Sequence, residues 1–126
     1  MAKKTKAKSS RSSKRKPRAR KAQKNPSAKL PKDAVTLVVI LRAKEGQELL
    51  MQAELGALLV PTRKEEGCLV YDLHRAADAG GSFFLHEVWA SRDAHAAHTR
   101  TPHFVRWNAR KDAMLASREV TFWKKI

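Results

Sequence analysis

The pattern of apolar and polar residues predicts a mixed α and β domain that starts near residue 35. Residues 35–42 (VTLVVILR) are apolar at nearly every position and rich in β-branched side chains, which is typical of a strand covered on both faces. Residues 47–60 instead place apolar side chains at helical spacing, and Pro61 is expected to disturb or end that helix. The apolar positions of this helix are Leu49, Leu50, Ala53, Ala57 and Val60.

Two further strands are predicted to form a hairpin. Residues 69–75 and 82–90 have strand-like patterns, and the loop between them contains Gly80 and Gly81. A short glycine-containing connection makes the two strands antiparallel neighbours.

Two helix starts follow the hairpin. Ser91 is a suitable N-cap for a short helix over residues 92–99. Thr101 followed by Pro102 combines a cap with a first-turn proline, and it predicts a second helix that runs to about Leu115.

Residues 119–124 (EVTFWK) alternate and are predicted to be the last strand, which gives the order β-α-β-β-α-β. This order defines an α+β domain with a ferredoxin-like split βαβ arrangement and a four-stranded antiparallel sheet. Helices cover only one face of such a sheet, yet residues 35–42 are apolar on both. A second copy of the same sheet is the economical cover, so we expect a symmetric homodimer.

Charge divides the chain into two parts. Residues 1–32 hold 14 of the 27 Lys and Arg residues and no acid, so most of the net charge of +15 belongs to this segment. Residues 1–33 are therefore predicted to be a disordered polybasic tail and residues 34–126 a folded domain. The tail favours salt-sensitive, non-specific binding to nucleic acid, with an anionic membrane surface or no dedicated partner as alternatives. The expected polyanion contacts are Lys14, Arg15, Lys16, Arg18, Arg20 and Lys21.

Other sequence features bear on the cellular location of the protein and on whether it binds a metal or a cofactor. No apolar run of about 18 residues exists, so no membrane span is expected. Cys68 is the only cysteine, so no intrachain disulfide forms, and this fits a cytoplasmic protein whose tail could associate with the nucleoid. The segment from His86 to Ala90 (HEVWA) lacks the second histidine of a zinc-protease motif, and no metal is predicted. No glycine-rich dinucleotide or phosphate loop occurs, and no cofactor is predicted.

Residues 35–124 resemble the antibiotic biosynthesis monooxygenase family of dimeric α/β barrels. The resemblance rests on EGCLVYDLHR at 66–75, on EVWAS at 87–91, and on the pair AH at 97–98 followed by PHF at 102–104. It implies a cofactor-independent oxygenase that uses O₂ on a small quinol or phenol. Such a reaction requires a base, an apolar pocket and hydrogen bonds to the substrate anion. The alternative is a non-catalytic dimeric domain whose tail binds nucleic acid.

Histidine and aromatic residues are the candidates for these tasks. The predicted catalytic residues are His86, His98 and His103. The predicted substrate-binding residues are Tyr71, His74, Trp89, Phe104, Trp107 and Asn108. For Trp89, core or dimer packing is favoured over a place in the pocket wall, and the Tyr71 hydroxyl is equally a candidate for a structural tether. By resemblance, haem-degrading relatives use an Asn on the first strand and a His near position 108. This chain has neither, so haem binding is disfavoured.

Overall fold

The computed structural model describes residues 30–78 and 80–126. The six predicted polyanion contacts between Lys14 and Lys21 lie outside the described residues, as does nearly all of the predicted tail. Among the described residues, no helix is long and apolar enough to cross a membrane. The elements are β2 (Val35–Ala43), α3 (Glu48–Gly56), α4 (Leu59–Arg63), β3 (Cys68–Arg75), β4 (Ser82–Trp89), α5 (Arg92–His98), α6 (Pro102–Arg110), a 3₁₀ turn η3 (Lys111–Ala113) and β5 (Leu115–Trp123).

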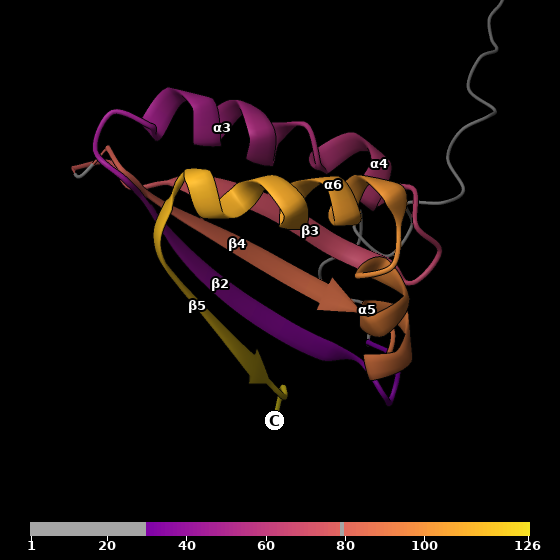
Figure 1. Cartoon of the computed structure of the whole chain (residues 1–126). Helices are drawn as coiled ribbons and strands as arrows, with labels where there is room; N and C mark the ends of the chain where they lie inside the picture. The colour runs from indigo at the N-terminus through magenta and orange to yellow at the C-terminus, as the bar shows by residue number, and fades with distance from the viewer. Residues whose placement is uncertain (1–29, 79) are drawn as a thin grey trace, which may run out of the picture. The chain divides into compact units, whose positions relative to one another are not determined.

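The four strands form one antiparallel sheet in the order β3-β4-β2-β5. The two central strands are the first and third in sequence, which confirms the predicted ferredoxin-like arrangement. Helices α3, α4 and α6 lie over one face of this sheet, and α5 packs near the end of β4 (Figure 1). The register pairs Leu37 with Glu87 and Val38 with His86, so each pair lies on one face of the sheet.

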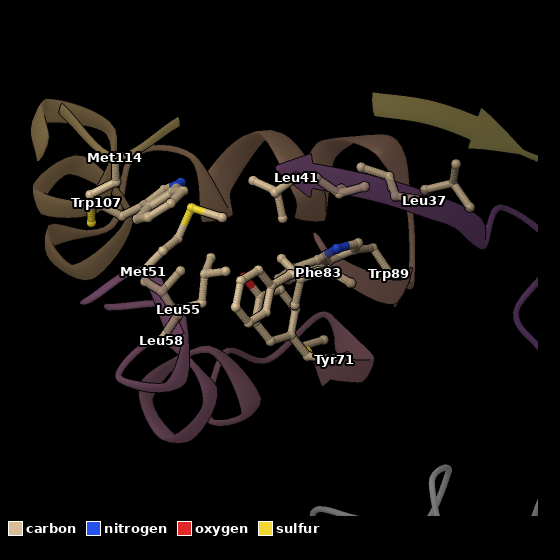
Figure 2. Packing of buried hydrophobic residues seen from close by; sticks show 14 residues of the cluster. Leu37, Leu41, Met51, Leu55, Leu58, Tyr71, Phe83, Trp89, Trp107 and Met114 are labelled. Atoms are coloured by element: carbon tan, nitrogen blue, oxygen red, sulfur yellow. The ribbon is translucent and has the colours of Figure 1, made fainter. Parts of the chain in front are cut away.

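Alternation along β2 separates a buried face from a half-exposed one. Val35, Leu37, Val39 and Leu41 are buried toward the helices, whereas the residues between them are only half buried. Figure 2 shows the core that results, with leucines of β2 facing side chains from α3, α6 and the neighbouring strands. Its largest fully buried members include Trp89, Tyr71, Phe83, Met51, Leu55 and Met114.

The first helical segment differs from the prediction of one helix that Pro61 disturbs or ends. It consists of two helices, α3 and α4, and Pro61 lies in the first turn of α4. The first backbone N–H groups of a helix have no partner within the helix, so a proline costs little there. The first turn-closing bond in this region runs from the Thr62 N–H to the Leu58 carbonyl at 3.0 Å. Pro61 is therefore a helix-start residue.

The last helix and strand also have different bounds from those predicted. Helix α6 ends at Arg110, not near Leu115, and β5 begins at Leu115 instead of residue 119. Strand β5 pairs with β2 over most of its length, from Ala43 with Leu115 to Thr36 with Trp123. The segment LASR has weak strand propensity by itself, and pairing with a central strand decides its conformation.

Candidate active site

A cavity of about 350 Å³ lies between the helix-facing side of the sheet and the α5–α6 segment. Its walls are mainly apolar and aromatic, with Leu37, Leu85, Tyr71, Phe104, Trp107 and Phe122 among the lining residues. Besides the Tyr71 and Thr99 hydroxyls, four side chains bring carboxyl, imidazole or guanidinium groups to the same cavity: Glu87, His95, His98 and Arg118. Apolar walls with a few convergent polar groups are typical of a small-molecule site.

Both histidines of the α5–α6 corner are placed by predicted helix caps. The Ser91 hydroxyl accepts a hydrogen bond from the Ala94 N–H at 3.0 Å, and Thr101 accepts one from the Phe104 N–H at 3.3 Å. Both capping predictions are therefore confirmed. His98 is the last residue of α5 and His103 is the second residue of α6, so the short connection brings them together.

A single carboxylate oxygen joins the two histidines. Glu65 lies in the loop between α4 and β3, and its Oε2 is 2.8 Å from His98 Nδ1 and 2.6 Å from His103 Nε2. A carboxylate only accepts hydrogen bonds, so neutral His98 carries its proton on Nδ1 and donates it to Glu65. The lone pair of His98 Nε2 then remains free, and His98 lines the cavity. We call Glu65, His98 and His103 the Glu–His–His cluster.

The ring of His98 is fixed by its aromatic neighbours. It is 1% exposed, and its centroid lies 4.7 Å from that of Trp89, 5.0 Å from Phe104 and 5.7 Å from Tyr71. Burial lowers the pKa of His98, and this effect outweighs the opposing effect of the hydrogen bond that His98 donates to Glu65. His98 is therefore a neutral imidazole held in one orientation.

Close packing between the loop before β3 and helix α5 holds Glu65 near His98. The Ala90 N–H donates to the Gly67 carbonyl at 2.8 Å, so the loop before β3 lies against the start of α5. A Cβ atom added at Gly67 would collide with the Cβ of Ala94 on α5. Only glycine fits here without movement, and Gly67 is two residues from Glu65.

Glu87 is the second ionisable group that is buried at the cavity. The indole Nε1 of Trp89 donates to Glu87 Oε1 at 2.9 Å, as expected for residues two apart on one strand face. Burial raises the pKa of Glu87 to about 7; the Trp89 hydrogen bond opposes this change, and the Glu65 charge adds to it. Both the neutral and the ionised carboxyl are therefore populated near neutral pH.

His95 and Arg118 complete the polar lining. His95 packs edge-on to Phe122 at 5.5 Å between centroids and lies 6.0 Å from the His98 ring. Burial, followed by the charges of His98 and Arg92, lowers the pKa of His95 to about 4. Arg118 lies on the exposed edge strand β5 and is the only guanidinium among the described lining residues.

The structure brings together only some of the predicted site residues. His98, Tyr71, Phe104 and Trp107 line the cavity. Trp89 is fully buried behind it, and His103 reaches it only through Glu65. Burial raises the pKa of the Tyr71 phenol far above its usual range, so Tyr71 is a neutral hydroxyl.

Three predicted residues lie elsewhere. His86 points to the opposite face of the sheet from Glu87, because neighbouring strand residues alternate between faces. His74 shares that opposite face and stacks on Phe84 at 4.9 Å. Asn108 is exposed on α6. Their prediction as site residues therefore does not agree with the position of this cavity.

Four residues of the site were missed by the sequence reasoning: Glu65, Glu87, His95 and Arg118. Glu87 shares a strand face with Trp89, and His95 is one helical turn before His98, so a signal existed for both. Glu65 reaches the site from a loop, and nothing in its local sequence indicates that. Cys68 is buried, and burial raises the pKa of its thiol to about 12, which leaves it protonated.

Comparison with known proteins places this chain in a family. The model of the antibiotic biosynthesis monooxygenase family matches residues 34–110, and the chain belongs to that family. "Putative monooxygenase Rv0793" of Mycobacterium tuberculosis is 40% identical over 65 residues, covering 52% of this chain and 63% of that protein. The chain therefore aligns with less than two thirds of that relative.

Solved structures agree with this assignment. The structure of PA3566 from Pseudomonas aeruginosa has 31% identity and a TM-score of 0.73, covering 75% of this chain and 95% of that one. The structure of Rv0793 from Mycobacterium tuberculosis has 30% identity and a TM-score of 0.71, covering 75% of this chain and 96% of that one. These matches confirm the predicted fold and family.

Proposed function

We propose that the chain is a cofactor-independent monooxygenase that oxidises a small quinol or phenol with O₂. The observation that carries this proposal is the position of His98, whose Nδ1 is bonded to Glu65 while the ring lines an apolar cavity. This arrangement provides a base that is neutral, oriented and shielded from water. The cavity volume of about 350 Å³ suits a ligand of one or two rings.

The first step is removal of a phenolic proton by His98 Nε2. The imidazolium that forms is stabilised by the Glu65 carboxylate on its other nitrogen, as in other base–carboxylate pairs. The phenolate is electron-rich and transfers an electron to O₂, and the resulting radicals combine at a ring carbon. The His98 imidazolium returns its proton to the peroxide, and loss of water, which also takes the hydrogen of that ring carbon, leaves one oxygen atom in the product as a carbonyl. The substrate itself supplies both reducing electrons, so the protein contributes the base and the dry cavity.

Glu87 and Arg118 provide contacts to the substrate. A protonated Glu87 donates a hydrogen bond to a substrate oxygen, and the guanidinium of Arg118 favours an anion. Phe104, Trp107 and Tyr71 form flat apolar surfaces against which an aromatic ring packs.

Oxygen uptake with a panel of quinols and phenols tests the proposal. His98→Gln is expected to reduce kcat/KM by about 100-fold or more, the usual contribution of a general base. Glu65→Gln keeps the shape of the carboxylate but removes its charge, so it should lower kcat with little change in KM. His74→Gln is the matched control, because His74 is exposed on the other face of the sheet. Equal rates for the His98 and His74 variants would contradict the assignment of His98 as the general base.

The half-exposed sheet face supports assembly as a homodimer. Val38, Ile40 and Phe84 are only half buried on this face, and Trp123 is 55% exposed. Covering them with a second sheet removes apolar surface from water. Sedimentation should give twice the chain mass, and Val38→Glu should give a monomer. A wild-type monomer at micromolar concentration would contradict the dimer.

The basic tail favours a second function, non-specific nucleic-acid binding. The 14 Lys and Arg residues in the first 32 positions are enough for multiple phosphate contacts, and a dimer would carry two such tails. Gel retardation of random-sequence DNA should weaken steeply with salt and disappear when residues 1–32 are deleted. Retention of binding by the deleted chain would assign it to the domain instead.

A further inference from the structure

The Glu–His–His cluster has the composition of a metal site. Its three donor atoms, a carboxylate oxygen and one nitrogen from each imidazole, lie within 4.8 Å of one another. They come from three segments, the loop before β3, the end of α5 and the start of α6. We propose that this cluster binds a divalent transition-metal ion of the zinc type, a property that goes beyond the proposed oxygenase reaction.

The donor set matches the preferences of such ions. Imidazole suits zinc, copper, iron and nickel, and two imidazoles with one carboxylate recur in zinc and iron centres that keep an open position. The fourth position would be taken by water.

The charge of the cluster favours a cation. The Glu65 carboxylate contacts His98 and His103, and within the described residues no lysine or arginine lies within 4.0 Å of it. A bound divalent ion would therefore place positive charge beside a carboxylate that has no lysine or arginine partner in the described part of the chain.

Two of the ligands are pre-organised, and the third can adjust. The His98 ring is held by Trp89 and Phe104, and His103 is placed by the first turn of α6, which Thr101 caps. Metal bonds of about 2.0–2.1 Å in a tetrahedron place ligand atoms about 3.3 Å apart. Glu65 Oε2 must therefore retreat by about half an ångström from both nitrogens, which its position in a loop permits.

Metal binding would change what His98 offers to the cavity. When Nδ1 binds the ion, the neutral ring carries its proton on Nε2. His98 Nε2 is then a hydrogen-bond donor to the cavity, whereas in the metal-free protein it is an acceptor. The ion and a substrate proton would compete for the same imidazole. Zinc is therefore expected to inhibit any turnover that uses His98 as a base.

Equilibrium dialysis of the chelator-treated full chain against Zn²⁺, with metal analysis, tests the site without any substrate. One zinc per chain is expected, and Co²⁺ should give the visible absorption of a four-coordinate ion. The full chain is suitable because residues 1–32 contain no His, Cys, Asp or Glu. Since no turnover is measured, failure of this site and failure of the oxygenase proposal are separate results.

The partly exposed His103 provides the decisive variant. His103→Gln should weaken zinc binding by more than about 100-fold, since even outer-shell partners contribute 10–100-fold. His74→Gln, a histidine on the opposite sheet face, should bind zinc like the wild type. Circular dichroism checks that both variants are folded. No zinc retained by the wild type at micromolar free metal, or equal binding by both variants, would overturn the proposal.

Discussion

Glu87 provides a quantitative test of the electrostatics of the cavity. Its carboxyl is 4% exposed, and burial raises its pKa from 4.5 to about 7. The folded chain therefore binds more protons at this residue than the unfolded chain does between those values. By linkage, its contribution to stability is fully present below pH 4.5 and is lost as the pH rises through about 7. One pKa unit corresponds to about 1.36 kcal/mol, so a difference of about 2.5 units corresponds to about 3 kcal/mol of folding free energy.

Glu87→Gln removes this pH dependence while preserving the acceptor for the Trp89 indole N–H. The amide has its own cost, but that cost does not change with pH. The free energy of unfolding of the variant, relative to that of the wild type, should therefore rise by about 3 kcal/mol between pH 4 and pH 8. Urea unfolding of both proteins at several pH values measures this difference.

His95 makes the comparison between variants necessary. Its pKa is lowered from 6.5 to about 4, so its contribution to stability is present above 6.5 and is lost as the pH falls toward 4. This effect opposes that of Glu87 in the wild type, but it cancels in the difference between the two proteins. Glu45→Gln, at an exposed position, is the control for the substitution itself. Parallel stability curves for Glu87→Gln and the wild type would refute the buried-carboxyl argument.

Three further predictions concern packing, capping and thiol reactivity. Leu55→Ala in the core should destabilise the fold by about 2–5 kcal/mol in urea unfolding, whereas Leu49→Ala, 74% exposed on the same helix, should change it by less than about 0.5 kcal/mol. Ser91→Ala should cost about 1 kcal/mol in the same assay, because the Ala94 N–H loses its acceptor; no change would show that water replaces the cap. The Cys68 thiol should resist a thiol reagent at pH 8 in the native protein and react at once in denaturant; fast native labelling would contradict its burial and raised pKa.

The sequence predicted the fold where local pattern and long-range pairing agree. The β-branched segment that begins at Val35 and the caps at Ser91 and Thr101 are short-range signals, and the structure confirms them. Pro61 shows the limit of a local rule, because a proline fits a helix start as well as a helix end. The residues from Leu115 became a strand through pairing with β2, which no local pattern records.

The site was only partly predictable because it combines residues that are distant in the sequence. His98 and His103 are close along the chain, and their meeting follows from two adjacent helix ends. Their partner Glu65 is 33 residues from His98. Because neighbouring residues of a strand alternate between faces, the sequence predicts that His86 and Glu87 point to opposite faces of the sheet. Only the position of the helices shows which of these faces has the cavity. The local pattern therefore did not show which of the predicted histidines line the cavity.

The contact between Gly67 and Ala94 has a consequence for engineering the protein. Gly67 has no side chain and takes no part in the chemistry, yet its size sets how near α5 can come to the loop that carries Glu65. A methyl group there would clash with Ala94, so we expect α5 and this loop to move apart, and His98 and Glu65 lie on the two sides of that contact. Two donor atoms would then separate while every chemical group stays the same. We therefore expect the side-chain volume at position 67 to alter the distance between Glu65 and His98 without any change to the residues that line the cavity.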